Sequence, residues 1–500
     1  MRRLFVRSFA IALTCFTVFF GLEFFLEWSR AGYPGWGSQS YAGHHDNAKL
    51  VDVLSPMARA YNNILAMLIG MIGLAIPLTA NMHTPKLIEM FLSDRINRIV
   101  LTFITAGAAH VLWVDYMIGP EFAPTWAIGF AVIFALVGWA LLLPYFFYVI
   151  RFIDPSRLVV RLQLAANVIV HQVAERTRDA ASAQQEALRR IGQLGTIIIK
   201  SLDRSDRDVA AEGAWALKCM LDDYEKFKKR MPKEWFIVDR ADFVGLSDEA
   251  LEMISEDKTW YEFKALLQLE LGFMRALSSA PDTVSVFSDA LRVIASRAHE
   301  NHDEAALRQC IRFFNNFLRE AIKKGNLRAV YDVFHQYRKL ARTLVDRPEV
   351  LREIGNHFVY YAGMARMSKM VFAPHLALFD LGFIVRRAYE RAAPCAAELL
   401  AQALSLPHRT NEDVHSMAVK AKLILGGFFI ENKLAAEAEL VRKNLADIES
   451  NEIDRAEKDL LNADRSFFEV TDRQVNLEYV PPERREPLRE FCVSLQHQRG

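Results

Sequence analysis

Four long apolar stretches lie within the first 150 residues of this 500-residue chain. They cover residues 4–26, 61–79, 99–117 and 126–150, and after Arg7, near its start, the first is interrupted only by Glu23. An α-helix needs about 20 consecutive apolar residues to cross the hydrocarbon core of a bilayer. Each stretch is about that long, so the sequence predicts a four-helix transmembrane domain over residues 1–154.

The first apolar stretch has a second interpretation, because a basic start followed by an apolar run is also typical of a secretory signal. The run is longer than the apolar core of such a signal. Glu23, Glu27 and Trp28 lie where small residues would mark a cleavage site. We therefore expect this stretch to be a retained helix.

Basic residues flank the predicted spans on one side of the membrane. They precede the first span, lie between the second and third, and follow the fourth. These residues are Arg2, Arg3, Arg7, Lys86, Arg95, Arg98, Arg151, Arg157 and Arg161. Lysine and arginine are enriched in cytoplasmic loops, so we expect both termini in the cytosol.

Residues 155–500 have the pattern of a soluble, mainly α-helical domain. Apolar residues recur at three- and four-residue steps over 203–229, 282–298, 304–323, 327–345, 348–367 and 411–448, as in amphipathic helices. Short breaks occur at Gly325-Asn326 and Asn432-Lys433. No fixed period runs through three repeats, so we expect an irregular helical array, and a solenoid-like stack stays open as the alternative. Residues 235–238 and 474–480 are the main strand candidates, and an extended loop is the alternative for each.

Ionisable residues inside spans are costly and point to function. Glu23, His110 and Asp115 form a candidate polar cluster within the membrane. An ion path or proton relay is one interpretation. The other is that these side chains are solvated at the interface or hydrogen-bonded between helices, and we weight it more heavily.

A turn between the second and third spans forms a second candidate site. Thr84 caps a short helix with Pro85 at its first position, and Asp94, Arg95 and Asn97 follow before the next span. This elbow would couple the spans to the cytosolic domain. Below the last span, Arg151, Arg157 and Arg161 either contact anionic lipid or serve only as topology determinants.

No further chemical site emerges from the sequence. His44-His45-Asp46 could bind a divalent metal, but further ligands are missing, so we expect no metal and no cofactor. Phosphate loops, zinc-protease motifs and nucleophile elbows are absent, and no catalytic residue can be named. The net charge of +1 gives no reason to expect a nucleic-acid partner. Five scattered cysteines suggest reduced thiols.

Residues 84–112 read TPKLIEMFLSDRINRIVLTFITAGAAHVL. This segment resembles a family of uncharacterised bacterial inner-membrane proteins, a domain-of-unknown-function family with about four N-terminal transmembrane helices and a cytosolic domain. The resemblance is strongest over residues 69–155. It implies a location in the bacterial inner membrane, and it implies no activity, because the family has none established.

Three functions follow as hypotheses. The leading one is a non-enzymatic sensor or scaffold that is anchored in the membrane and presents a helical binding surface to a cytosolic protein partner. The second is a channel or transporter, which would need a homo-oligomer to enclose a pore. The third, a membrane-bound enzyme, rests on no specific residue.

Overall fold

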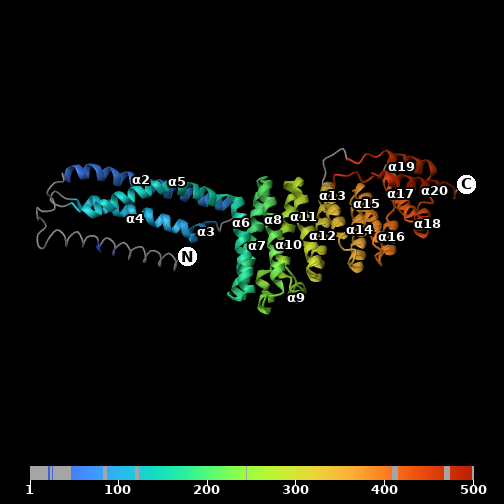
Figure 1. Ribbon diagram of the computed structural model, residues 1–500, viewed down its shortest axis with the longest axis horizontal. Helices are drawn as coiled ribbons and strands as arrows, with labels where there is room; N and C mark the ends of the chain where they lie inside the picture. Colours follow the sequence, from blue (N-terminus) through green and yellow to red (C-terminus); the bar gives the residue numbers. More distant parts are fainter. Residues whose placement is uncertain are drawn as a thin grey trace. The chain divides into compact units, whose positions relative to one another are not determined.

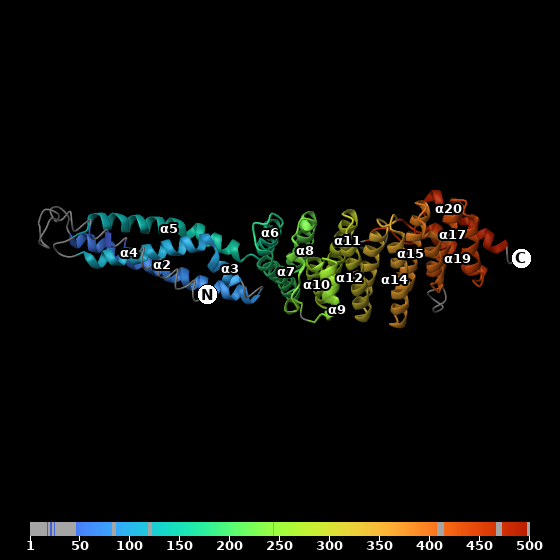
Figure 2. The same cartoon turned by 90° about the horizontal axis from the view of Figure 1, so that it is seen from below.

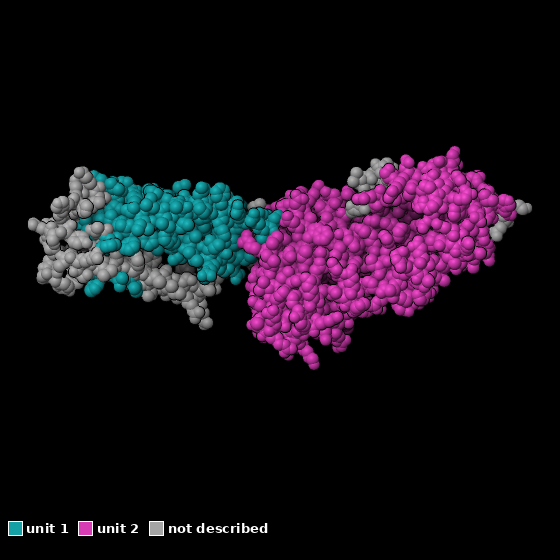
Figure 3. All heavy atoms as spheres, in the orientation of Figure 1, with its two compact units in different colours: residues 1–158 teal, residues 159–500 magenta. Residues whose placement is uncertain are grey.

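The computed structural model describes residues 47–82, 87–118, 123–243, 245–407, 415–466 and 473–497, together with the single residues 18, 21, 22 and 25. The chain divides into two compact units (Figure 3). We call residues 1–158 the membrane unit and residues 159–500 the helical unit. The division falls a few residues after the domain boundary expected from the sequence.

The membrane unit contains four described helices, α2 (Asn47–Met82), α3 (Leu87–Ser93), α4 (Arg95–Met117) and α5 (Thr125–Ile153) (Figure 1). Within the described residues, three stretches are long and apolar enough to cross a membrane: Val51–Thr79, Arg95–Met117 and Trp126–Ile153. They correspond to the second, third and fourth predicted spans. The first predicted span, residues 4–26, lies almost entirely outside the described residues.

The second span is longer than predicted. Residues 47–60 belong to the same helix, because α2 runs without a break from Asn47 to Met82. Proline occurs at positions 56 and 77 of this helix. The apolar residues before Pro56 simply extend the span, so periodicity alone did not reveal where it begins.

Tyr61 joins the three spans of the membrane unit. Its side chain is 1 % exposed. A Cβ atom built on Gly107 of α4 would lie 2.8 Å from the Tyr61 hydroxyl, and one built on Gly138 of α5 would lie 2.3 Å from it. The tyrosine therefore occupies space that only two glycines leave free, as at small-residue interfaces between membrane helices.

Replacing Gly138 with alanine should destabilise this bundle by about 1–3 kcal/mol, because an added methyl group must displace the Tyr61 ring. Thermal unfolding of the purified protein in detergent measures the effect. Gly70→Ala in α2 is the matched control, since a Cβ there meets nothing within 4 Å. Equal melting temperatures for the two variants would contradict the packing role of Gly138.

The helical unit is built from two rows of helices, which succeed one another along the unit (Figures 1 and 2). In one row, each helix contacts the next in the order α8, α11, α13, α15 and α17. In the other row, the order is α7, α10, α12, α14 and α16. The row helices are α7 (Ala180–Asp203), α8 (Arg207–Lys228), α10 (Trp260–Ser279), α11 (Val284–Glu300), α12 (Glu304–Lys323), α13 (Leu327–Ala341), α14 (Pro348–Met367), α15 (Phe372–Glu390), α16 (Ala396–Ser405) and α17 (His415–Glu431).

Further helices complete the unit. α6 (Pro155–Ala174) precedes the rows, and α9 (Asp248–Glu256) follows two 3₁₀ turns, η1 (Lys233–Phe236) and η2 (Arg240–Asp242); a third turn, η3 (Pro281–Thr283), leads into α11. At the far end, α18 (Ala435–Asn444), α19 (Ser450–Asn462) and α20 (Pro482–His497) pack against α17. Gly427 allows the last contact, because a Cβ there would lie 2.9 Å from the Leu488 backbone.

The helix boundaries follow local sequence signals. Gly325 adopts a φ of 65°, which glycine tolerates best, and it ends α12. Asn326 then caps α13 by accepting a hydrogen bond from the Ala329 amide at 3.0 Å. The predicted break at these two residues is confirmed, and so is the mainly α fold class. Neither strand candidate forms a strand in the described residues: Trp235 lies in η1, and 474–480 forms only an isolated bridge from Val475 to Ser466.

Candidate functional site

The predicted elbow contains a hydrogen-bonded corner between α3 and α4. Asp94 caps α4 by accepting from the amides of Ile96 and Asn97 at 3.0 and 3.1 Å. Its carboxylate also accepts from the hydroxyl of Tyr148 on α5 at 2.8 Å. Asn97 is 1 % exposed and donates to the Phe91 carbonyl at 3.1 Å. The corner is thus tied to the end of α5.

The remaining elbow residues divide into two groups. Arg95 is exposed at the start of α4, whereas Thr84 and Pro85 lie outside the described residues. Phe91 is 1 % exposed and packs edge-on against Phe152, with ring centroids 5.4 Å apart. A coupling role of the elbow stays a prediction.

The candidate intramembrane residues occupy different surroundings. His110 is fully buried, and its ring centroid lies 5.4 Å from that of Phe134 on α5. Asp115 accepts a hydrogen bond from the Ser55 hydroxyl of α2 at 2.5 Å. Glu23, and also His44, His45 and Asp46, lie outside the described residues. The polar cluster therefore stays a prediction, and the Asp115 contact is the kind expected between packed membrane helices.

The three arginines below the last span also differ in setting. Arg151 lies exposed in the last turn of α5, and Arg161 lies partly buried in α6. Arg157 forms an ion pair with Asp154 at 3.3 Å. Lipid contact by these side chains stays a prediction.

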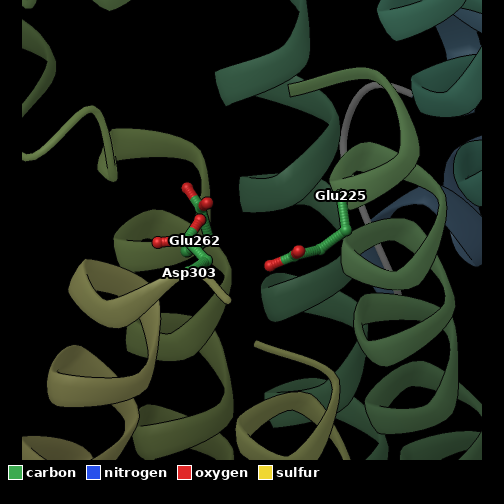
Figure 4. A group of neighbouring side chains, drawn as sticks. All are labelled: Glu225, Glu262 and Asp303. Carbon is green, nitrogen blue, oxygen red and sulfur yellow. The ribbon is translucent and has the colours of Figure 1, made fainter. Parts of the chain in front are cut away.

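A buried charge cluster, which sequence analysis missed, lies between α8, α10 and the start of α12. The carboxylate oxygens of Glu225, Glu262 and Asp303 lie within 4.8 Å of one another. Figure 4 shows Glu225 pointing from its helix toward the other two side chains. The ammonium group of Lys228 lies 2.5 Å from both Glu262 and Asp303. We call these four residues the Lys228 cluster.

The Lys228 cluster has the composition of a cation site but already holds its own cation. Burial lowers the pKa of Lys228, but the carboxylates of Glu262 and Asp303 outweigh burial and hold that pKa above its ordinary value. A metal ion would have to displace this ammonium group from both carboxylates. The residues present therefore fit a structural ion pair better than a metal centre.

Glu225 should make the stability of the helical unit depend on pH. Burial, Glu262 and Asp303 raise its pKa from 4.5 to about 7. The folded state therefore keeps a proton that the unfolded state releases, and the free energy of unfolding should decrease as pH rises from 4.5 to 7, by at most about 3 kcal/mol. Urea unfolding at several pH values measures this loss. Glu225→Gln should flatten the dependence in that range, and an unchanged slope would contradict it.

A second buried ion pair lies at the other end of the helical unit. Asp380 of α15 is fully buried, and both its oxygens accept hydrogen bonds from Arg473 at 2.6 Å. Arg338 of α13 lies 3.3 Å from the same carboxylate. Burial raises the pKa of Asp380, but the two arginines outweigh burial and hold that pKa below its usual value. Arg473 also donates to the Tyr331 carbonyl at 3.0 Å, so it fastens the segment before α20 onto α13 and α15.

Three arginines surround one aromatic ring beside this ion pair. The guanidinium carbons of Arg338, Arg342 and Arg386 lie 4.8, 5.3 and 5.2 Å from the centroid of the Phe383 ring. Such cation–π contacts hold guanidinium groups in place while leaving their N–H groups free to donate. In the described part of the chain, neither Arg342 nor Arg386 forms an ion pair. Burial, followed by Arg484, lowers the pKa of Arg386 to about 10, so it remains charged at neutral pH.

These side chains line a cavity of about 580 Å³ between α13, α15, α17 and the segment that leads into α20. We call it the arginine cavity. Its described lining contains six arginines and one acidic residue, Glu483. The arginines are Arg338, Arg342, Arg386, Arg465, Arg473 and Arg484. Asp380 offsets part of this charge, and Arg484 pairs with Glu431 at 3.2 Å and with Glu390 at 3.7 Å. The cavity keeps a surplus of positive charge, which favours an anion.

One histidine beside Arg338 is neutral. Burial, Arg473 and Arg338 lower the pKa of His335 to about 3. Its Nδ1 atom accepts a hydrogen bond from Arg338 at 3.0 Å. His335 therefore orients an arginine rather than adding to the positive charge.

Comparison with known proteins gives one match. Residues 2–199 match the model of a family described as "Predicted membrane protein (DUF2254)". The matched range includes residues 69–155, where the resemblance in the sequence is strongest, but it ends before the arginine cavity. No curated protein and no solved structure matches the chain. Over residues 2–199, the chain is therefore similar to a family of predicted membrane proteins without an established activity, which agrees with the three apolar helices among its described residues.

Proposed function

We propose that this chain is a non-enzymatic sensor or scaffold, anchored in the bacterial inner membrane by several spans, with both termini and the helical unit in the cytosol. The helical unit acts as a solenoid-like binding platform in this proposal. Two rows of stacked helices support it, because such arrays present extended surfaces to partners. The observation that carries the proposal is the arginine cavity, which offers a binding place for an anionic ligand.

The arrangement of charge favours ligand binding over a purely structural role. A structural arginine at a buried site is paired, as Arg473 is with Asp380. Arg342 and Arg386 instead approach other arginines around Phe383. Like charges held close together reduce stability, and such unfavourable arrangements recur where a ligand completes the site. The described membrane unit offers no comparable observation in favour of a channel.

Titration calorimetry with the full-length protein in detergent tests the proposal. Sulfate and orthophosphate serve as probes of an oxyanion site. We expect binding by the wild-type protein and at least tenfold weaker binding by the double variant Arg342→Gln/Arg386→Gln. Without ligand, the double variant should melt at the same or a higher temperature, because repulsion is removed.

Arg391→Gln is the matched control, since Arg391 is exposed at the end of α15 and does not line the cavity. It removes the same charge and should leave binding unchanged. The proposal fails if the wild-type protein binds neither anion, or if the control and the double variant lose affinity equally.

A further inference from the structure

The arginine cavity has features that indicate which kind of anion it binds. This inference rests on the proposed function of the chain as an anion-binding sensor. Its charges come from different parts of the chain. Arg342 extends from the end of α13, Arg386 from α15, and Arg484 from the first turn of α20. Arginines on three elements offer more N–H donors than one small anion can pair with bidentately. A ligand with adjacent oxyanionic groups can engage all three.

The donor type points to phosphate. All the basic side chains in the described lining are arginines. The planar guanidinium group presents paired N–H donors that match two oxygens of a phosphate, whereas a lysine offers only a point charge. Arg338, Arg342 and Arg386 are already held against Phe383, so they lose little conformational freedom when a ligand binds.

The volume of the cavity and the apolar residues of its lining indicate that the ligand has an organic part. A volume of about 580 Å³ is within the range of sites that enclose small organic ligands, roughly 300–1,000 Å³. Apolar side chains lie among the arginines, including Phe379, Ile424 and Leu425 on the helices and Val475 and Leu477 on the closing segment. Inorganic phosphate would leave this apolar surface uncovered.

We infer that the arginine cavity binds a small organic diphosphate, with its two phosphate groups between Arg342, Arg386 and Arg484 and its organic part against the apolar lining. This chemistry occurs both in nucleoside diphosphates and in short prenyl diphosphates. The closing segment and α20 contribute part of the cavity, so the ligand connects them to α13 and α15. Occupancy should therefore hold the carboxyl-terminal segment in place.

Calorimetry with the full-length protein in detergent tests this inference with four probes: orthophosphate, pyrophosphate, ADP and geranyl diphosphate, all without divalent metal. We expect pyrophosphate to bind at least tenfold more tightly than orthophosphate. We also expect ADP or geranyl diphosphate to bind at least as tightly as pyrophosphate, and the better of the two identifies the source of the diphosphate. Arg484→Gln should weaken diphosphate binding about tenfold, and Arg391→Gln should not.

Limited proteolysis provides a second measurement. Anion binding to a merely charged surface would not change the rate of cleavage. Whichever of ADP and geranyl diphosphate binds more tightly should slow cleavage after residue 473 at least threefold in the wild-type protein. It should not do so in Arg342→Gln/Arg386→Gln. Equal affinity for orthophosphate and pyrophosphate would overturn the diphosphate inference while leaving an anion-binding sensor intact. If both organic esters bound tenfold more weakly than pyrophosphate, the inference that the ligand has an organic part would be overturned. Absence of binding by every anion would overturn both this inference and the proposed function.

Discussion

Replacing Asp380 with asparagine should lower the free energy of unfolding of the helical unit by about 3–5 kcal/mol, the usual cost of removing one partner from a buried ion pair. The substitution leaves Arg473, which is 1 % exposed, without its bidentate carboxylate. It also removes a partner of Arg338. Two buried guanidinium groups would then face each other without compensation, and the segment before α20 would lose its main attachment.

Chemical unfolding of the full-length protein in detergent, followed by circular dichroism, measures the loss. Asp464→Asn is the control, because Asp464 is exposed and close to the same segment in sequence; we expect a change below about 0.5 kcal/mol there. Because the pKa of Asp380 is held below its ordinary value in the folded state, its contribution is present above pH 4 and is lost as pH falls further. A loss below 1 kcal/mol for Asp380→Asn would contradict the role assigned to this ion pair.

Most helices of this protein could be predicted from the sequence, because each of the two units has a simple pattern of apolar residues. Residues 61–79, 99–117 and 126–150 are mostly apolar, and each lies inside a helix long enough to cross a bilayer. In the helical unit, three- and four-residue spacing predicted α8, α11, α12, α13 and α14 close to their actual bounds. Turn residues such as Gly325 and Asn326 marked the breaks. Local chemistry therefore specifies most of the elements.

Helices without a clear polar face were harder to recognise. α15 is buried over most of its surface, including His375 and Asp380, so its sequence shows no amphipathic stripe. α10 is similar, with Trp260, Tyr261 and Glu262 all buried. Central helices that contact neighbours on several sides lose the periodicity on which a sequence prediction depends. Both charge clusters involve these helices, so periodicity was least informative at the two sites where buried charges gather.

The arginine cavity could not be predicted because its members are far apart in the chain. Arg338 and Asp380 are separated by one helix, and Arg473 lies 93 residues beyond Asp380. Only the packing of α13 against α15, and the return of the closing segment across them, brings these charges together. One sequence signal was available. Arg338 and Arg342 are four residues apart, which places both on one face of a helix. That pattern alone is more often a solvated surface.

Lys228→Met should have an effect as large as Asp380→Asn, at the opposite end of the same unit. Glu262 is 1 % exposed, and removal of the ammonium group leaves it and Asp303 as close carboxylates without a cation. Loss of one partner from such a site costs about 3–5 kcal/mol. Lys226→Met is the matched control. Lys226 is two residues away and forms an exposed ion pair with Asp223, worth at most about 1 kcal/mol.

The double variant Lys228→Met/Glu262→Gln separates the ion pair from the packing of the lysine side chain. If the loss in Lys228→Met comes from an uncompensated buried charge, removal of the Glu262 charge should recover about half of it or more, because buried ion pairs replaced on both sides are often nearly neutral. Asp303 keeps its charge in both variants and still caps α12 through the Ala306 amide. Equal destabilisation of the single and double variants would show that the aliphatic part of Lys228 supports this region, and that charge pairing contributes little to its stability.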